Sequence, residues 1–133
     1  MLVPMSDSNI DLVDRFIAAI ECRDIDTVLA IYADDAVIWH NFDQIETTAQ
    51  DNARQMKWFS SRLAGLKYED IRRIAFPGGV IQQHVLRGTA PNGDSVAVHA
   101  MLRIDIVGDR IVRLEEYLDP AQAASLALPA VSA

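Results

Sequence analysis

Three histidines are the residues best suited to acid/base chemistry. His40, His84 and His99 all fall in segments dominated by apolar residues, where a polar ring needs a partner or a function. Imidazole has an unperturbed pKa of about 6.5, so each could act as a general acid or base near neutral pH. The alternative is a hydrogen-bonded structural histidine. His40 is the strongest candidate because it ends an apolar run and precedes Asn41, whose amide can donate or accept a hydrogen bond.

A carboxylate in the last apolar run of the chain is the second candidate. If that run is a strand, Glu116 shares its face with Val112, Leu114 and Leu118. A carboxylate on an apolar face is costly to bury unless it is hydrogen-bonded. Glu116 is therefore either a functional group in a pocket or a structural residue with a partner, and the sequence favours neither.

Other polar and aromatic residues give weaker signals. Gln82 and Gln83 precede His84 and could hydrogen-bond a ligand oxygen, although a glutamine in a strand is usually solvated. Trp39 and Trp58 could line a pocket, although aromatic residues at such spacings more often fill a core. Neither pattern by itself identifies a substrate.

The sequence carries no recognised cofactor or metal motif. It has no glycine-rich phosphate loop, no zinc-type Cys/His pattern and no nucleophile elbow. Asp43 is the only carboxylate within three residues of a histidine, so we expect no metal site. We likewise expect no cofactor, and any function must lie in a site assembled from scattered residues.

The composition is that of a globular protein with an acidic surface. The chain has 133 residues, 50% hydrophobic and 23% charged, which fits a single domain at 1–133. We place the core at about residues 7–119 and a tail at 120–133. A formal net charge of −7 repels phosphate backbones and anionic lipids, so we expect no nucleic-acid or membrane partner. Without a basic leader or a spanning segment, we expect a cytoplasmic protein.

The first half of the chain has helical periodicity. Apolar residues recur at three- and four-residue spacings, which indicates amphipathic helices at about 6–22, 24–32 and 48–63. A short β-prone run at 36–40 separates the second helix from the third. Cys22 is the only cysteine, so an internal disulfide is excluded, and its helical neighbours predict a buried thiol.

The second half of the chain has the pattern of antiparallel strands. Turn sequences rich in proline, glycine, asparagine and aspartate interrupt long β-prone runs. The runs predict strands at 66–76, 80–90, 95–107 and 110–118. Helices followed by a meander of strands predict an α+β fold, because parallel units would need a helix between successive strands.

Two segments resemble a known superfamily. Residues 14–41, DRFIAAIECRDIDTVLAIYADDAVIWHN, resemble the opening of nuclear transport factor 2-like proteins, especially the SnoaL-like and ketosteroid isomerase-like branches. Residues 108–119, GDRIVRLEEYLD, are similar to their last strand. The resemblance covers nearly the whole chain and implies a cone: a curved antiparallel sheet wrapped around three N-terminal helices, the cystatin-like α+β roll. It specifies the fold better than the reaction, because this cone hosts isomerases, cyclases, epoxide hydrolases, dehydratases and non-catalytic domains.

Comparison with the ketosteroid isomerase branch implies a role for one residue and shows two positions where this chain differs from those enzymes. His40 takes the position of the proton-shuttling aspartate of those enzymes. Phe16 stands where they have an oxyanion-binding tyrosine, and Met101 stands approximately where they have a protonated aspartic acid. The resemblance therefore implies a proton shuttle and argues against steroid isomerisation.

Comparison with limonene epoxide hydrolases implies that only some of their catalytic residues have counterparts in this chain. Trp39 and Asn41 resemble the Tyr and Asn that hold the attacking water, and Glu116 matches the catalytic aspartate. His84 and Leu86, however, stand about where those enzymes have an arginine and a second aspartate. SnoaL-like cyclases need one acid/base residue in an apolar pocket, and the sequence is compatible with that.

Two hypotheses follow. The first is an acid/base enzyme of isomerase, cyclase or hydrolase type that acts on a small lipophilic molecule in an apolar pocket. Its catalytic residues are His40 and Glu116, and its substrate-binding residues are Asn41, His84, His99, Trp39, Phe16, Met101 and Trp58. The alternative is a non-catalytic module for small-ligand binding or dimerisation. The resemblance also implies a homodimer through the outer face of the sheet.

Overall fold

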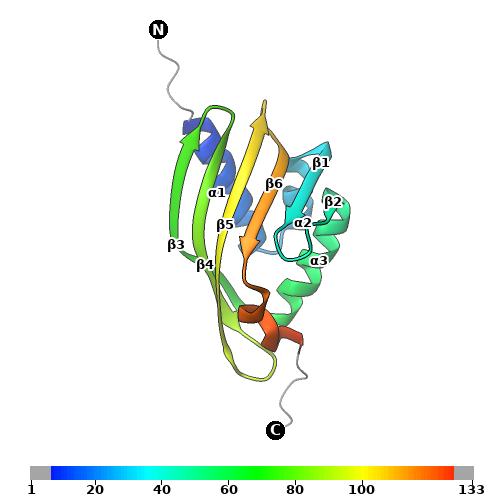
Figure 1. Cartoon of the computed structure of the whole chain (residues 1–133), viewed down its shortest axis with the longest axis vertical. Helices are drawn as coiled ribbons and strands as arrows, with labels where there is room; N and C mark the ends of the chain where they lie inside the picture. The colour runs from blue at the N-terminus through cyan, green and yellow to red at the C-terminus, as the bar shows by residue number, and fades with distance from the viewer. Residues whose placement is uncertain (1–6, 128–133) are drawn as a thin grey trace.

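A curved six-stranded sheet with helices on one side forms the framework of the molecule (Figure 1). The computed structural model describes residues 7–127. The elements in chain order are α1 (Asp7–Glu21), α2 (Ile25–Ile31), β1 (Tyr32–His40), β2 (Glu46–Thr48), α3 (Ala49–Arg62), β3 (Ala64–Phe76), β4 (Gly79–Thr89), β5 (Ser95–Val107), β6 (Arg110–Leu118) and the 3₁₀ helix η1 (Pro120–Ala127). The predicted α+β class with three leading helices and a curved sheet is confirmed. Residues 128–133 of the predicted tail lie outside the described residues.

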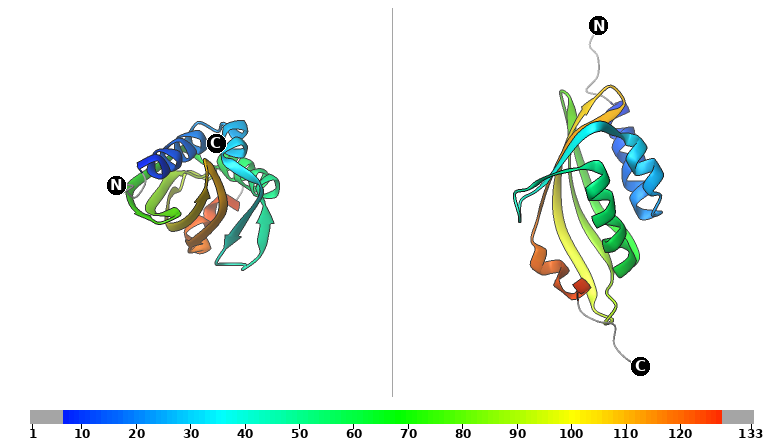
Figure 2. Two further views of the ribbon diagram at one scale, coloured as in Figure 1. Left: turned by 90° about the horizontal axis from the view of Figure 1, so that it is seen from above. Right: turned by 90° about the vertical axis from the view of Figure 1, so that its right-hand side faces the viewer.

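The sheet has the strand order β2-β1-β6-β5-β4-β3, and α1 and α3 lie across its inner face (Figure 2). Strands β3 to β6 form the predicted antiparallel meander. The pair β1–β6, however, is parallel. These two strands are far apart in the chain, because β2, α3 and the strands β3 to β5 lie between them. This long connection provides the crossover that parallel neighbours require. The edge strand β2, at residues 46–48, was not predicted.

The ends of the first helices follow from local interactions. Asp24 caps α2 by accepting a hydrogen bond from the backbone N–H of Thr27, and Thr48 caps α3 by accepting one from the N–H of Asp51. The helix α1 ends at Glu21, and the chain turns at Arg23 with a φ of 60°. Cys22 lies in this turn and is exposed, so the predicted buried thiol is wrong. The apolar stripe of α1 ends before it reaches that position.

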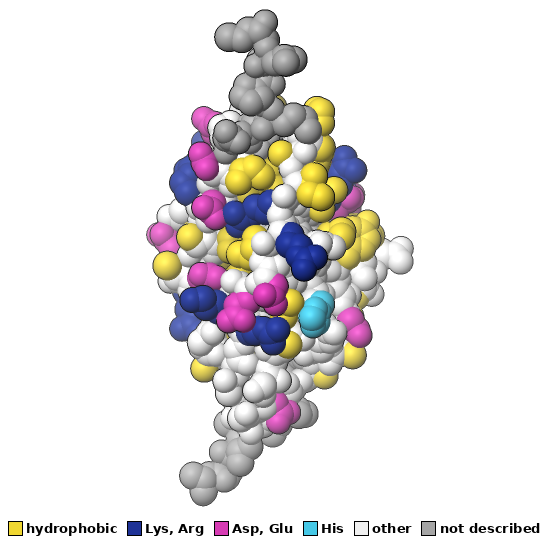
Figure 3. All heavy atoms as spheres, turned by 90° about the vertical axis from the view of Figure 1, so that its left-hand side faces the viewer, with side chains coloured by type: hydrophobic (Ala, Val, Ile, Leu, Met, Phe, Trp, Pro, Cys, Tyr) yellow, Lys and Arg dark blue, Asp and Glu magenta, His cyan; other side chains and the backbone are white. Residues whose placement is uncertain are grey.

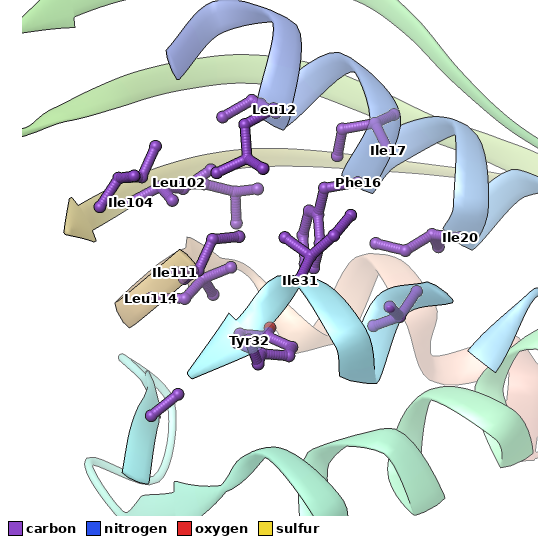
Figure 4. Close-up of a cluster of buried hydrophobic side chains, with 14 of the residues drawn as sticks. Leu12, Phe16, Ile17, Ile20, Ile31, Tyr32, Leu102, Ile104, Ile111 and Leu114 are labelled. Carbon is purple, nitrogen blue, oxygen red and sulfur yellow. The ribbon is translucent and has the colours of Figure 1, made fainter. Parts of the chain in front are cut away.

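The main core lies between α1, α2 and the strands. Its α1 side chains, which include Leu12 and Phe16, face Leu102 and Ile104 of β5 and Ile111 of β6 (Figure 4). A second, smaller cluster lies near η1, where Leu126 packs with residues of β4, β5 and the end of α3. The two clusters are separate, and the region between them on the inner face of the sheet is where a binding site could lie. Within residues 7–127, no helix is long and apolar enough to cross a membrane.

Candidate active site

Strand pairing places a line of side chains across the inner face of the sheet. His40 of β1 pairs with Glu116 of β6, Glu116 pairs with Leu102 of β5, Leu102 pairs with Gln82 of β4, and Gln82 pairs with Arg73 of β3. Directly paired residues project from the same face of a sheet. We call these five residues the transverse row. Its polar members form two groups, one on each side of Leu102.

The first group is the pair of His40 and Glu116. Nε2 of His40 lies 3.1 Å from Oε1 of Glu116, and the two side chains are 11% and 23% exposed. Burial opposes protonation of the imidazole, but the hydrogen bond and negative charge of Glu116, together with the charge of Asp43, outweigh it and raise the pKa of His40. The ring of Phe42 lies beside the imidazole, with 5.2 Å between ring centroids. The pair can therefore hold a proton between the imidazole and the carboxylate.

The second group is a chain of hydrogen bonds that ends on His84. Arg73 donates from Nε to Oε1 of Gln82 at 2.7 Å and from Nη1 to Oδ1 of Asp14 at 2.7 Å. Nε2 of Gln82 lies 2.9 Å from Nδ1 of His84. Gln82 is fully buried and His84 is 4% exposed. Burial is the main cause that lowers the pKa of His84 to about 4, and Arg73 adds to the effect against the opposing charge of Glu116.

Both groups border one cavity of about 440 Å³ between the helices and the inner face of the sheet. Its walls are mostly apolar and come from every layer of the fold; they comprise Phe16, Ile20, Tyr32, His40, Phe42, Asn52, Gln55, Met56, Trp58, Phe59, Tyr68, His84, Leu86, Val98, Ala100, Leu102, Leu114, Glu116, Leu118, Pro120 and Ala123. Phe42 and Trp58 are about half exposed, at 49% and 54%, and so lie at the rim. The cavity has the size and apolar character of a small-molecule site.

Two tyrosines add hydroxyl groups to the cavity wall. Burial raises the pKa of both Tyr32 and Tyr68 above the ordinary tyrosine value, and the charge of Glu116 adds to the shift. Both therefore stay protonated as O–H donors. Among the described residues, nothing hydrogen-bonds to the Tyr32 hydroxyl, although its oxygen is buried. A buried polar atom of this kind is costly unless a ligand or solvent molecule satisfies it.

The structure brings together five of the nine residues predicted for the site. His40, Glu116, His84, Phe16 and Trp58 all line the cavity. Trp39, Asn41, His99 and Met101 do not line it.

The remaining four predicted residues lie elsewhere for reasons of strand alternation or hydrogen bonding. Trp39 and Met101 project from the outer face of the sheet, and Trp39 packs edge-on against Tyr117 at 5.4 Å. His99 is also on the outer face and is exposed. Asn41 accepts a hydrogen bond from the backbone N–H of Leu118 at 3.0 Å, so its side chain ties β1 to the end of β6.

The predicted site did not include six polar residues: Tyr32, Asn52, Gln55 and Tyr68 line the cavity, and Gln82 and Arg73 connect to His84. Tyr32 lies at the end of a helical stripe and was assigned to the second helix, whereas Tyr68, Gln82 and Arg73 look like ordinary strand residues. Strand alternation could have indicated Gln82, because residues two apart in a strand lie on the same face, and Gln82 is two residues from His84. In the part of the chain that the structure describes, no three His, Cys, Asp or Glu side chains gather to hold a metal ion.

Solved structures with the same fold fall into several functional classes. A proposed polyketide cyclase from Xanthomonas campestris pv. campestris is 18% identical, with a TM-score of 0.78 over 92% of this chain and 99% of that one. A proposed isomerase from Bacillus subtilis is 15% identical, with a TM-score of 0.77 over 90% and 92%. An LEH-like epoxide hydrolase from M. tuberculosis is 21% identical, with a TM-score of 0.73 over 92% of each chain. No curated protein sequence matches the chain.

These neighbours define the fold as the nuclear transport factor 2-like cone, the fold that the sequence resemblance implied. The SnoaL-like domain family matches residues 13–114, which is well over half of the chain. The protein therefore belongs to the SnoaL-like domain family. Its relatives of this fold include cyclases, isomerases and epoxide hydrolases, so membership alone leaves the reaction open.

Proposed function

We propose that the protein is an acid/base enzyme that acts on a small lipophilic molecule bound in the cavity. The observation that carries the proposal is the contact of 3.1 Å between His40 and Glu116 inside a mostly apolar enclosure. Ionisable pairs are seldom buried without a role, and perturbed titration in a cavity is typical of active sites. The described relatives with cyclase, isomerase and epoxide hydrolase names support the class of reaction.

In the proposed mechanism, the pair of His40 and Glu116 works as one unit. Oε1 of Glu116 is held by Nε2 of His40, so one proton is shared between the two side chains. The carboxylate takes a proton from the substrate, while the imidazolium stabilises the negative charge and orients the carboxylate. The same unit returns the proton at another position of the substrate, in an isomerisation or a ring closure, or activates water in a hydrolysis.

The shape and chemistry of the cavity support the proposed substrate class. A volume of about 440 Å³ accommodates a compact molecule rather than a polymer. Apolar side chains make up most of the walls, with leucine and phenylalanine the most frequent, so a mostly apolar substrate fits. Apart from the acid/base pair, the polar groups of the wall are uncharged, namely Tyr32, Asn52, Gln55, Tyr68 and His84, and they suit a neutral molecule with one or two oxygen atoms.

Proton transfer can be tested before the natural substrate is known. Purified protein is incubated in D₂O with a panel of lipophilic cyclic ketones and epoxides, and deuterium uptake next to the carbonyl and diol formation are followed by mass spectrometry. We expect the native protein to convert at least one compound and Glu116→Gln to do so about 10² to 10⁴ times more slowly.

Glu115→Gln is the matched control for this assay. Glu115 is the adjacent carboxylate in β6, but it accepts a hydrogen bond from Arg113 at 3.1 Å and is not part of the cavity wall. Its substitution should leave conversion unchanged. If Glu116→Gln and His40→Gln both retain full turnover, the pair does not carry the proton transfer, and the proposed function is wrong. If the native protein converts no compound of the panel, the cavity is better described as a binding site without catalysis.

We also propose that the protein forms a homodimer through the outer face of the sheet. Met101 and Tyr117 are paired across β5 and β6 on that face, and they are 38% and 45% exposed. Towards the β3 edge, apolar side chains lie among charged ones of both signs (Figure 3). Sedimentation at low micromolar concentration should show a dimer for the native protein and a monomer for Met101→Lys. A native protein that sediments only as a monomer would contradict this proposal.

A further inference from the structure

The second polar group of the transverse row determines which nitrogen of His84 carries the proton. An arginine guanidinium can only donate hydrogen bonds. Since Nε of Arg73 lies 2.7 Å from the side chain of Gln82, the glutamine must present its oxygen to the arginine. The second contact of Arg73, to Asp14 at 2.7 Å, holds the guanidinium in place. The orientation of the Gln82 amide is therefore fixed by chemistry.

The amide then fixes the imidazole. With its oxygen turned to Arg73, Gln82 can offer only its NH₂ group to Nδ1 of His84, at 2.9 Å. This NH₂ group is a donor, so Nδ1 must be an acceptor and cannot carry a proton. A histidine with an unprotonated Nδ1 is neutral and carries its hydrogen on Nε2. Gln82 is fully buried, so solvent cannot compete for either of its hydrogen bonds.

The remaining surroundings of His84 agree with a neutral ring. Tyr68 packs against the imidazole with 4.6 Å between ring centroids, and Glu116 and Arg73 are the charged groups whose fields reach it. Burial and the positive charge of Arg73 both oppose a second proton on the ring. His84 lines the cavity, and among residues 7–127 the one hydrogen-bond contact of its ring is from Nδ1 to Gln82, which leaves Nε2 without a protein acceptor.

We propose that Arg73 and Gln82 are positioning residues that hold His84 as the neutral Nε2–H tautomer, and that His84 donates a hydrogen bond to a carbonyl oxygen of the ligand in the cavity. The proposal deepens the proposed function, because it rests on the same cavity and defines its ligand as an apolar carbonyl compound. Tyr32 supports this ligand class, because its buried hydroxyl in the same wall has no protein partner within the described residues. A neutral donor polarises a carbonyl group and stabilises the negative charge that develops on its oxygen when a neighbouring proton is removed.

The tautomer can be read directly by NMR in the full chain. Long-range ¹H–¹⁵N correlation spectra at pH 7 distinguish a protonated ring nitrogen from an unprotonated one. We expect His84 to show an unprotonated Nδ1 and a protonated Nε2. A protonated Nδ1 in the native protein would overturn the proposal without any variant. The spectrum does not depend on turnover, so an inactive protein with this tautomer would refute only the proposed function.

Gln82→Glu tests the positioning role. A carboxylate in place of the amide can accept from Arg73 but offers only acceptors to His84, so Nδ1 must then carry a proton. We expect the unprotonated Nδ1 signal to be lost. Gln83→Glu is the matched control, because Gln83 is the next residue of β4 and is exposed on the outer face. A folded Gln82→Glu variant with the native His84 spectrum would overturn the positioning role.

Two probe molecules test the ligand class. The bicyclic ketone 2-decalone and the hydrocarbon decalin have nearly the same shape, and only the ketone can accept a hydrogen bond. We expect 2-decalone to move the Nε2–H resonance of His84 and decalin to leave it in place. The same shift from both compounds, or from neither, would overturn the carbonyl assignment while leaving the tautomer result intact.

Discussion

Two buried histidines on opposite sides of one cavity behave in opposite ways. His40 and His84 are 9% and 4% exposed, and burial by itself favours the neutral form of both. The pKa of His40 is nevertheless raised, whereas that of His84 falls to about 4. The difference comes from the partner of each ring. His40 meets the carboxylate of Glu116, whereas His84 meets a neutral amide that Arg73 has already oriented.

The comparison shows how one sheet face can hold two buried histidines whose pKa values shift in opposite directions. Leu102 stands between Gln82 and Glu116 in the transverse row and is 4% exposed. Its apolar side chain keeps the two polar groups from hydrogen-bonding to each other, although the charge of Glu116 still acts on His84. One side of the cavity therefore carries a carboxylate–imidazole pair that can exchange a proton, while the other presents a fixed donor. An acid/base enzyme for carbonyl compounds needs both kinds of group.

The largest expected effect is on the pKa of His40, when its partner is changed to an amide like the partner of His84. Glu116→Gln replaces the carboxylate of the first group with an amide and removes the main causes that raise the pKa of His40. Burial, which lowers this pKa, then outweighs the remaining charge of Asp43. We expect His40 to titrate below 6.5 in the variant and above 6.5 in the native protein, as followed by NMR. Unchanged titration of His40 would show that Glu116 is not its partner in solution.

The next effect concerns stability in acid. His84 has a pKa of about 4 in the folded protein and about 6.5 in the unfolded chain, so the unfolded chain binds more protons between these values. The free energy of unfolding must therefore decrease as the pH falls through this window. At roughly 1.4 kcal/mol per pKa unit, the loss attributable to His84 approaches about 3 kcal/mol at pH 4.

Denaturant titrations of the native protein and of His84→Gln isolate this contribution. Carboxylates titrate in both proteins, so their effect cancels in the difference. We expect the stability advantage of the native protein over His84→Gln to shrink by about 3 kcal/mol between pH 7 and pH 4. A difference that stays constant over this range would contradict the neutral, buried state of His84.

His40 should make a smaller contribution to the free energy of unfolding, with a pH dependence of opposite sign to that of His84. Its pKa is raised on folding, so the folded protein holds the proton more tightly than the unfolded chain. This contribution is complete below about pH 6.5 and is lost as the pH rises through the folded pKa. The stability advantage of the native protein over His40→Gln should therefore decrease from pH 6 to pH 9 in denaturant titrations. An advantage that increases with pH would reverse the assignment of the two histidines.

Local patterns were sufficient for most of the fold. The predicted strands at 95–107 and 110–118 coincide with β5 and β6, because turn residues mark both ends of each run. The strand β1 begins at Tyr32 rather than at residue 36, since Tyr32 also continues the apolar spacing of the preceding helix. The three residues of β2 carry no alternation long enough to recognise.

The candidate site was less predictable because its contacts are not local. His40 and Glu116 were each identified from residue type and strand position, but their contact depends on the parallel register of β1 and β6. No local pattern encodes a pairing between residues separated by the whole meander. Gln82 was named as a group that could hydrogen-bond a ligand, although its residue type favours a solvated side chain, and only the structure shows that Arg73 reaches it from the neighbouring strand.

The third histidine should give the smallest effect. His99 is exposed on the outer face of β5, and the side chain of Gln122 accepts a hydrogen bond from its backbone N–H at 2.9 Å rather than from its ring. His99→Gln should therefore change the free energy of unfolding by less than about 0.5 kcal/mol and leave the titrations of His40 and His84 unchanged. Strand alternation is the reason, because an odd-numbered position in β5 faces away from the cavity that Val98 and Ala100 line. If His99→Gln instead reduced conversion in the deuterium assay as strongly as Glu116→Gln, catalysis would depend on the outer face. The proposed roles of His40 in proton transfer and of His84 as a hydrogen-bond donor would then be wrong.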